Sequence, residues 1–419
     1  RNAITHFFKI IPQNKYLIIY LSGNKRIICF NNNITFAHLM AVQFAVFDHI
    51  SKLPADWQHF ASIKTTMQAD HIGVQDVAAI ENLKSYYLIG SEQEVPVFIA
   101  YFQLLSVKPK HFNLGEKKLQ QFFLDRALQI VKPTLLVAGN LFRHDDDFFQ
   151  FAENVIDSEQ KNALYRLSVD YMIAHTNASG IFLKDVPKEI AGDIIHDESY
   201  HAMQEDVSME IMIPDHWHSL ADYDKDLKHK YLQRSKKMRK SFEGVKIREL
   251  NIEEIIKYQE AIFDLYLQVT QKQIVSMGML NANFFVQLKI ALKNNYRVCG
   301  FFLDDTLIAF SSAILHHDIY DMNYIGINYN YNQSHHLYFN ILFHCLESAI
   351  ESNSTKLILG RTALEAKAIM GCTPEYRYSF YKLRNVVVNW FYQRVAKYFS
   401  EARGDKWKER HPFKSTFYQ

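Results

Sequence analysis

Cysteine is scarce in this chain. Its 419 residues include four cysteines, and no two of them are spaced as a CxxC pair. This absence argues against a zinc site of the CxxC type and indicates a reducing compartment. Three of the four lie inside apolar runs, where a buried free thiol is the ordinary expectation.

Long hydrophobic runs are also missing. No stretch reaches the roughly 18 uninterrupted apolar residues that a membrane-spanning helix needs. The longest candidate, Phe36 to Ile50, is interrupted by polar residues and predicts a buried amphipathic helix. No signal-peptide pattern is visible. We therefore expect a cytoplasmic protein, with peripheral attachment at the inner membrane face as an option.

An excess of one charge is absent as well, since the formal net charge is +2. The net charge of the chain therefore does not indicate binding to nucleic acid, and any site for an anion must be a local patch of positive charge. Among the 19 histidines, the best metal-ligand candidates are His196 with His201 and His216 with His218. Neither pair has the i, i+4 spacing that presents two ligands on one helical face. We expect no metal site.

The length and composition predict two packed domains. The chain is 48% hydrophobic and 22% charged, which is typical of globular proteins. A length of 419 residues exceeds one ordinary core. We expect an N-terminal half at residues 1–204 and a C-terminal half at residues 205–419. No linker rich in glycine and serine separates them.

The stretch from Tyr296 to Pro374 organises the chain. Apolar runs at Val298–Leu303 and Leu307–Leu315 flank the turn Asp304-Asp305, which predicts a hairpin. A third run, Ile319–Ile327, is rich in β-branched and aromatic residues, as strands are. A loop without apolar periodicity, 328–336, is followed by a helical pattern from Leu337 to Ile350 and a last strand, Lys356–Leu359.

This order resembles the core of the GNAT acyltransferase superfamily. In that family the loop before the helix holds the pyrophosphate of an acyl-coenzyme A, at the positive end of the helix dipole. The resemblance implies that Asn328, Tyr331, Gln333 and Ser334 bind the coenzyme. The loop contains no glycine here, a departure that favours a diverged branch.

Two further motifs resemble the Fem-like group, bacterial proteins with two GNAT-like halves in one chain. The segment Leu359–Gly371 has that group's strand, Gly-Arg, and short helix carrying Glu and Lys. The segment Leu227–Phe242 resembles its basic helix, which we expect within residues 220–243. The resemblance implies an α/β fold of two GNAT-like halves, each a mixed central sheet flanked by helices.

An internal repeat is consistent with this. Residues 85–186 read again as hairpin, strand, loop, helix and strand, although no residue-level repeat is visible. The loop at Gly139-Asn140 is the expected equivalent of 328–336. Its aspartates would repel phosphate, so we expect the coenzyme in the C-terminal half. Helices are expected at about 34–51, 117–130 and 282–292, and a helix or a strand-helix pair at 386–399. A hairpin is expected at 16–30.

The basic helix allows two interpretations. Charged runs are usually solvated faces. Alternatively, the helix is an anion platform in the cleft between the halves. Because arginine contacts phosphate with bidentate geometry, Arg234 and Arg239 are the expected ligands.

Candidate catalytic residues are Lys367, Glu365 and Asp321, and candidate substrate contacts are Arg361, Tyr324 and Tyr378. Acyl transfer to an amine needs a base for the nitrogen and an acid for the leaving thiolate. Asp321 or Glu365 is the expected base and a tyrosine the acid, while Lys367 would stabilise an oxyanion, as the resemblance implies. The alternative is structural: a capped surface helix and packed tyrosines.

We expect an acyltransferase that moves an acyl group from acyl-coenzyme A to an amine by direct attack. The acceptor would be a small molecule, or a lipid or cell-wall precursor. One alternative is a Fem-type cell-wall peptide transferase dependent on aminoacyl-tRNA, although no long heptad arm is present. Another is a catalytically inactive tandem-GNAT protein that binds a ligand or partner.

Overall fold

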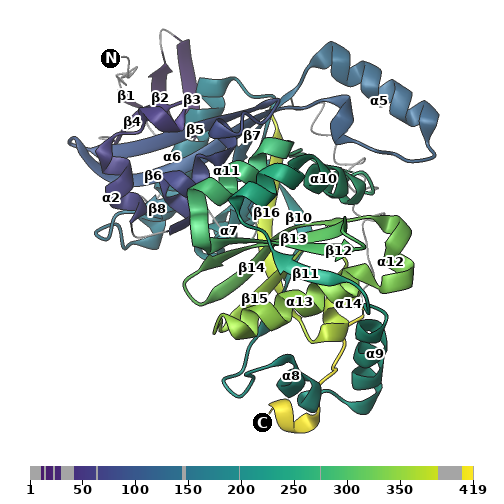
Figure 1. Ribbon diagram of the computed structural model, residues 1–419. Coiled ribbons are helices and arrows are strands. Elements are labelled where there is room, and N and C mark those ends of the chain that lie inside the picture. Colours follow the sequence, from purple (N-terminus) through teal and green to yellow (C-terminus); the bar gives the residue numbers. More distant parts are fainter. Residues whose placement is uncertain are drawn as a thin grey trace.

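A computed structural model describes residues 11–13, 16–21, 24–29, 42–62, 65–143, 148–197, 199–273, 275–385 and 408–418. Most described strands belong to one 13-stranded sheet (Figure 1). A separate three-stranded sheet is formed by β1 (Ile11–Gln13), β2 (Tyr16–Leu21) and β3 (Asn24–Cys29). The hairpin expected near the start of the chain corresponds to β2 and β3.

The first half of the large sheet begins at its edge strand, β4. Its strands are β4 (Val42–Phe47), β5 (Leu83–Glu92), β6 (Val95–Ser106), β7 (Thr134–Ala138), β8 (Phe149–Phe151) and β9 (Gly180–Val186). Its helices are α2 (Ala55–Ala61), α3 (Ala69–Ile72), α4 (Val74–Val77), α5 (Lys118–Val131), α6 (Ser158–Thr176) and α7 (Lys188–Ile195).

The second half repeats this order. The strands of the second half are β11 (Lys246–Glu249), β12 (Tyr296–Leu303), β13 (Thr306–His316), β14 (Ile319–Ile327) and β15 (Lys356–Gly360). Each half is followed in sequence by one more strand, β10 (His201–Met212) after the first and β16 (Thr373–Leu383) after the second. The helices of the second half are α8 (Leu220–Asp226), α9 (His229–Lys240), α10 (Ile252–Thr270), α11 (Ala282–Leu292), α12 (Tyr329–His335), α13 (Leu337–Glu351) and α14 (Leu364–Met370).

The expected internal repeat is confirmed by strand pairing. In the first half, β5, β6 and β7 pair antiparallel in sequence, and β7 then pairs parallel with β9. In the second half, β12, β13 and β14 pair antiparallel, and β14 pairs parallel with β15. A helix crosses over between the parallel strands each time: α6 in one half and α13 in the other. The fold is therefore α/β with two GNAT-like halves.

The two halves exchange a strand where they meet. β10 follows the first half in sequence, yet it pairs with β15 of the second half and with β16. β16 follows the second half in sequence and pairs with β9 of the first half. Met209 of β10 lies in the core around α13, and Phe380 of β16 lies in the core around α6. The exchange joins both halves into one continuous sheet. The boundary predicted between 204 and 205 falls inside β10 and stays a prediction.

Several expected elements need correction. Residues 42–47 of the helix expected at 34–51 form the strand β4, where Val42 and Phe44 are buried and Gln43 is exposed, the alternation of a sheet edge. The remainder of the described part, from 48 onwards, is a turn and a short 3-10 helix, and residues 34–41 lie outside the described ranges. The helix expected at 386–399 also lies outside them.

Two other corrections concern the second half. The basic helix expected at 220–243 is two helices, α8 and α9, because Leu227 adopts an extended conformation between them. The loop expected at 328–336 is mostly the helix α12. It lacks apolar periodicity because its residues are half-buried or exposed, and the side chain of Asn328 caps it instead.

Candidate functional site

The parallel strands of the second half separate near the seam between the halves. β14 pairs with β15 over Ile319–Asp321, and the rest of β14 pairs with β13. In the first half, β7 ends opposite Leu183 while β9 continues to Val186. The parallel pairing therefore stops before β14 ends in the second half and before β9 ends in the first. Ligand-binding residues of α/β proteins often lie at such strand ends.

A β-bulge lies next to the end of the parallel pairing in each half. On β9, three residue steps from Leu183 to Val186 oppose two steps on β16. On β14, three steps from Met322 to Ile325 oppose two on β13. An extra residue in one strand changes the direction in which neighbouring side chains point. The bulges involve Lys184 and Asp185 on β9, and Asn323 and Tyr324 on β14.

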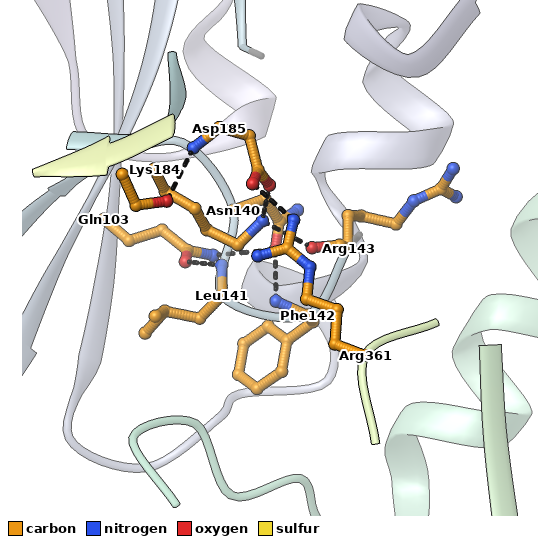
Figure 2. Close-up of polar contacts among 9 residues, drawn as sticks. Gln103, Asn140, Leu141, Phe142, Arg143, Lys184, Asp185 and Arg361 are labelled. Carbon is orange, nitrogen blue, oxygen red and sulfur yellow. Dashed lines mark hydrogen bonds and ion pairs between the residues drawn. The ribbon is translucent and has the colours of Figure 1, made fainter. Parts of the chain in front are cut away.

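Asp185 is the centre of a buried ionic cluster (Figure 2). Its carboxylate pairs with the ammonium of Lys184 and with the guanidinium of Arg361, the residue that follows β15. Burial alone would raise the pKa of Asp185, but the adjacent Lys184 and Arg361 cations outweigh it and lower that pKa. The backbone of Asp185 has φ 53, and its N–H donates to Ser379 Oγ at 3.2 Å. Aspartate tolerates this left-handed conformation better than most residues.

The loop after β7 brings backbone groups to the same place. Lys184 Nζ donates to the carbonyl of Arg143 at 2.8 Å. Asn140 accepts from the N–H of Phe142 at 2.9 Å, and Gln103 accepts from the N–H of Leu141 at 2.7 Å (Figure 2). These bonds fix the loop against β6 and β9.

A second contact across the seam joins this loop to β14. Arg143 Nη2 lies 3.6 Å from Asp321 Oδ2, and both side chains are buried. Tyr324 donates its hydroxyl to the carbonyl of Phe142 at 3.1 Å. Burial raises the pKa of Tyr324 well above its ordinary value, so the phenol stays protonated. Within the described ranges, Arg143 Nε has no hydrogen-bond partner.

Lys367 is a buried cation next to the cluster. It is 1% exposed, and its Nζ donates to the carbonyl of Gly360 at 3.0 Å, one residue before Arg361. Glu365 lies on the same short helix, α14, but its exposed side chain pairs with Arg410. The contacts across the seam therefore involve Asp321, Tyr324 and Arg361, whereas Lys367 is bonded to the strand end at Gly360 and Glu365 lies at the surface.

The residues expected to bind coenzyme phosphates lie on α12. The N–H of Asn330 is bonded to the side chain of Asn328 at 3.1 Å, and the N–H of Tyr329 to that of Gln268 at 3.4 Å. At the start of α13, Asn332 accepts from the N–H of Tyr338 at 3.0 Å. The N–H groups of Tyr329, Asn330 and Tyr338 are thus already bonded within the protein.

The other residues of that set have local contacts or solvent-exposed positions. Tyr331 packs against the second-half core, and its carbonyl accepts from Ser334 Oγ at 3.2 Å. Gln333 is exposed. Their assignment to coenzyme binding stays a prediction.

The basic helix lies away from the seam. Figure 1 shows α8 and α9 at the end of the second half farthest from the first-half strands. Arg239 pairs with Asp224 of α8 at 2.5 Å and lies over the ring of Phe343 on α13. The guanidinium of Arg234 lies over Phe339. The expected position between the halves is not found, because α9 packs on the outer side of α13.

An open groove lies where β9 meets β16. Its lining residues are Asp185, Val186, Pro187, Lys188, Glu375, Tyr376, Arg377 and Tyr378. Tyr378 is 37% exposed and pairs in register with Val186. The groove therefore places Tyr378 beside the buried Asp185, and it is the surface nearest to the ionic cluster. The described part of the chain contains no group of three or more His, Cys, Asp or Glu arranged to hold a metal.

Solved structures with related folds include three proteins of different kinds. A structure of FemX has a TM-score of 0.45 and 10% identity, covering 78% of this chain and 92% of its own. A tandem GNAT protein from the clavulanic acid biosynthesis pathway has a TM-score of 0.47 and 11% identity, covering 81% and 97%. L-PGS from Bacillus licheniformis has a TM-score of 0.45 and 9% identity, covering 84% and 99%. No family model and no curated protein matches this chain. At these identities the likeness concerns the fold.

Proposed function

We propose that this chain is an acyltransferase that moves an acyl group from a thioester donor, an acyl-coenzyme A, to an amine. The observation that carries the proposal is the group of buried and partly buried titratable side chains at the seam, where β14 separates from β15. Asp321 and Tyr324 lie on β14, and Arg361 follows β15. Clustered ionisable groups beside a groove are typical of reaction sites.

The chemistry assigns one role to each side chain. The amine nitrogen attacks the thioester carbonyl, a C–N bond forms and the C–S bond breaks. Asp321 accepts the proton that the nitrogen loses, and the phenol of Tyr324 gives a proton to the leaving sulfur. The cations of Arg361 and Lys367 stabilise the oxygen that becomes negative. The loop at Phe142 and Arg143 covers both β14 side chains, so substrate entry requires this loop to move.

The donor's phosphates need a site other than the start of α12, where the N–H groups of Tyr329 and Asn330 are already bonded. The basic surface of α9 remains a candidate for anion binding through Arg234, which is exposed, more than through Arg239, which is paired with Asp224. The same observation on α12 favours the second candidate function, a catalytically inactive tandem-GNAT protein that binds a ligand or partner.

A thiol-release assay separates these functions. The full chain would be incubated with acetyl- or long-chain acyl-coenzyme A and with amine acceptors, among them aminolipids and cell-wall peptide amines. The expected result is release of coenzyme A that depends on the acceptor. Asp321→Asn should lower kcat by about 100-fold or more. Asp305→Asn, in the exposed turn between β12 and β13, is the matched control and should leave kcat unchanged.

The donor classes give different outcomes. Transfer from aminoacyl-tRNA without any response to a coenzyme thioester would support the Fem-type alternative. A thermal shift with acyl-coenzyme A but no turnover would support the inactive binding protein. No binding and no turnover with either donor would overturn the proposal.

A further inference from the structure

Helix α5 exposes an apolar face. The exposed fractions are 70% for Leu119, 56% for Phe122, 63% for Phe123, 80% for Ile130 and 69% for Val131. No residue of this helix is buried against the described parts of the chain. Leu119, Phe122, Phe123 and Ile130 follow the i, i+3, i+4 spacing of one helical face. Figure 1 shows that α5 instead projects from the body.

The position of this helix is fixed at its base. It connects β6 to β7 of the first half, and a short 3-10 helix at Pro109–His111 precedes it. Asn113 Nδ2 donates to the carbonyl of Gln271, at the end of α10 in the second half, at 2.6 Å. The side chain of Gln121 accepts from the N–H of Leu114 at 3.0 Å. The helix is thus held by both halves while its apolar face points outward.

The charge around this helix has one dominant sign. Residues 108–132 contain six lysines and arginines against two acidic residues. Lys117 and Lys118 are exposed at the start of the helix and Lys132 at its end. The guanidinium of Arg126 lies over the ring of Phe122, and Asp125 is bonded to Gln121. A short apolar face with aromatic residues and flanking cations is the pattern of helices that lie in the interface of an anionic membrane.

The dimensions argue against a second copy of the chain as the partner. A helix of 14 residues is about 21 Å long and about 10 Å wide. It would bury roughly 200–400 Å² on its side, whereas a stable interface buries about 800 Å² per partner. A lipid surface needs no such area from one helix, because its charge attracts the lysines and its acyl region accepts the phenylalanines.

We propose that α5 docks this protein on an anionic lipid surface, with Phe122 and Phe123 inserted and Lys117 and Lys118 at the headgroups. The docked helix would turn the side of the molecule that carries the contact between Asn113 and Gln271 toward the lipid. The inference is independent of the proposed acyl transfer, because it rests on the exposed face alone and its readout is binding.

Flotation of the full chain with vesicles tests the proposal. We expect binding to vesicles of phosphatidylglycerol and phosphatidylcholine, and at least tenfold less binding to phosphatidylcholine alone. The double variant Phe122→Gln/Phe123→Gln should lose at least tenfold of the vesicle-bound fraction. Lys117→Gln/Lys118→Gln should lose about fivefold per lysine on anionic vesicles. Ile156→Gln, at a residue that is 80% exposed outside α5, is the control and should bind like the parent chain.

Tryptophan fluorescence at position 123 distinguishes a lipid surface from other possible partners of the apolar face of α5. In Phe123→Trp, measured against the parent chain, we expect the added emission to shift to the blue when anionic vesicles are added. Emission that is already blue-shifted without vesicles and does not change would mean that another part of the chain, or a second copy, covers the face. Sedimentation velocity would then identify the dimer. Either result, or equal binding by the double variant, would overturn the proposal.

Discussion

Asp185 of β9 and Arg361 after β15 belong to different halves of the chain, and the buried carboxylate of Asp185 pairs across the seam with the partly buried guanidinium of Arg361. A second contact runs the other way: Arg143, after β7, approaches Asp321 of β14. Each half therefore supplies one arginine from the loop after a central strand and one aspartate from a central strand. The strand exchange between β10 and β16 joins the backbone at the same place.

Removing the shared carboxylate should destabilise the chain more than removing one of its partners. Asp185→Asn leaves Lys184 and Arg361 buried without this counter-charge, and we expect a loss of about 3–5 kcal/mol. In Arg361→Gln the carboxylate still pairs with Lys184, so the loss should be about 1–3 kcal/mol. Urea unfolding of both variants measures the difference. Equal losses would show that Lys184 does not share the carboxylate.

Because of Asp185 we also expect the folded chain to lose stability in acid. The pKa of Asp185 in the folded state is lowered from 3.8 by the two cations, which outweigh burial. A group of this kind stabilises the folded state above its unfolded pKa, and that contribution is lost as the pH falls through the folded value. We expect the stability of the parent chain to fall below about pH 3.8, with a smaller slope in Asp185→Asn. A parallel decline in both proteins would assign the acid sensitivity to other carboxylates.

His111 should make stability depend on pH in a second, higher range than Asp185 does. Burial, together with Lys110 and Lys108, lowers the pKa of His111 from 6.5 to about 4, and its Nδ1 accepts from the N–H of Lys108 at 3.1 Å. Between pH 6.5 and 4 the unfolded chain binds a proton that the folded chain does not, so stability falls as the pH is lowered through this range. His111→Asn keeps an acceptor and does not titrate. Thermal unfolding from pH 7 to pH 4 should show a weaker pH dependence in this variant.

Much of the second half could be predicted from sequence, because its signals are local. The apolar runs on either side of Asp304-Asp305 predicted β12 and β13, and apolar spacing predicted α11 and α13. Edge and surface elements were harder. β4 is an edge strand that pairs only with β5, and its apolar run, interrupted by Gln43, does not distinguish a strand from a helix. The polar helix α12 is held by capping from Asn328, which an apolar pattern does not report.

The candidate site was predicted in part. Asp321 and Tyr324 were expected from their strand in the Tyr296–Pro374 stretch, and Arg361 and Lys367 from the motif that resembles the Fem-like group. Gln103, Asn140, Lys184 and Asp185 were missed. Those four meet partners far away in sequence, such as Asp185 and Arg361, so local patterns carry little information about them. One signal was present: Lys184-Asp185 is a charged pair inside the apolar strand Gly180–Val186. Charges in such a strand need buried partners.

Substitution of Tyr324 should distinguish a structural role of its hydroxyl from a chemical one. Its hydroxyl donates to the carbonyl of Phe142 at 3.1 Å, so Tyr324→Phe should cost about 1 kcal/mol of stability. If the phenol protonates the leaving thiolate, kcat should also fall by about 100-fold or more, while KM changes little. Urea unfolding and thiol release on the same preparation separate the two effects. A kcat equal to that of the parent chain would leave Tyr324 with its structural role.

The contact between α10 and β14 predicts opposite effects for two glycine substitutions. A Cβ on Gly326 of β14 would lie 2.7 Å from the backbone carbonyl carbon of Leu265 and 2.3 Å from the ring of Phe310. Helix α10 would have to move away from the strand, and we expect Gly326→Ala to cost about 1–3 kcal/mol. Gly192 of α7 has no atom within 4 Å of the corresponding position. Gly192→Ala should therefore stabilise the chain by about 0.5–1 kcal/mol, because alanine loses less backbone entropy in a helix.

Chemical denaturation of the two alanine variants and the parent chain measures both effects under one set of conditions. The sign of the difference is the informative result, since both substitutions add the same methyl group. If Gly326→Ala were neutral, α10 would not be held against β14 as closely as the contact with Leu265 indicates. The loop at Phe142 and Arg143 would then lose one of its supports, because Phe142 packs against the side chains of α11 that α10 holds in place.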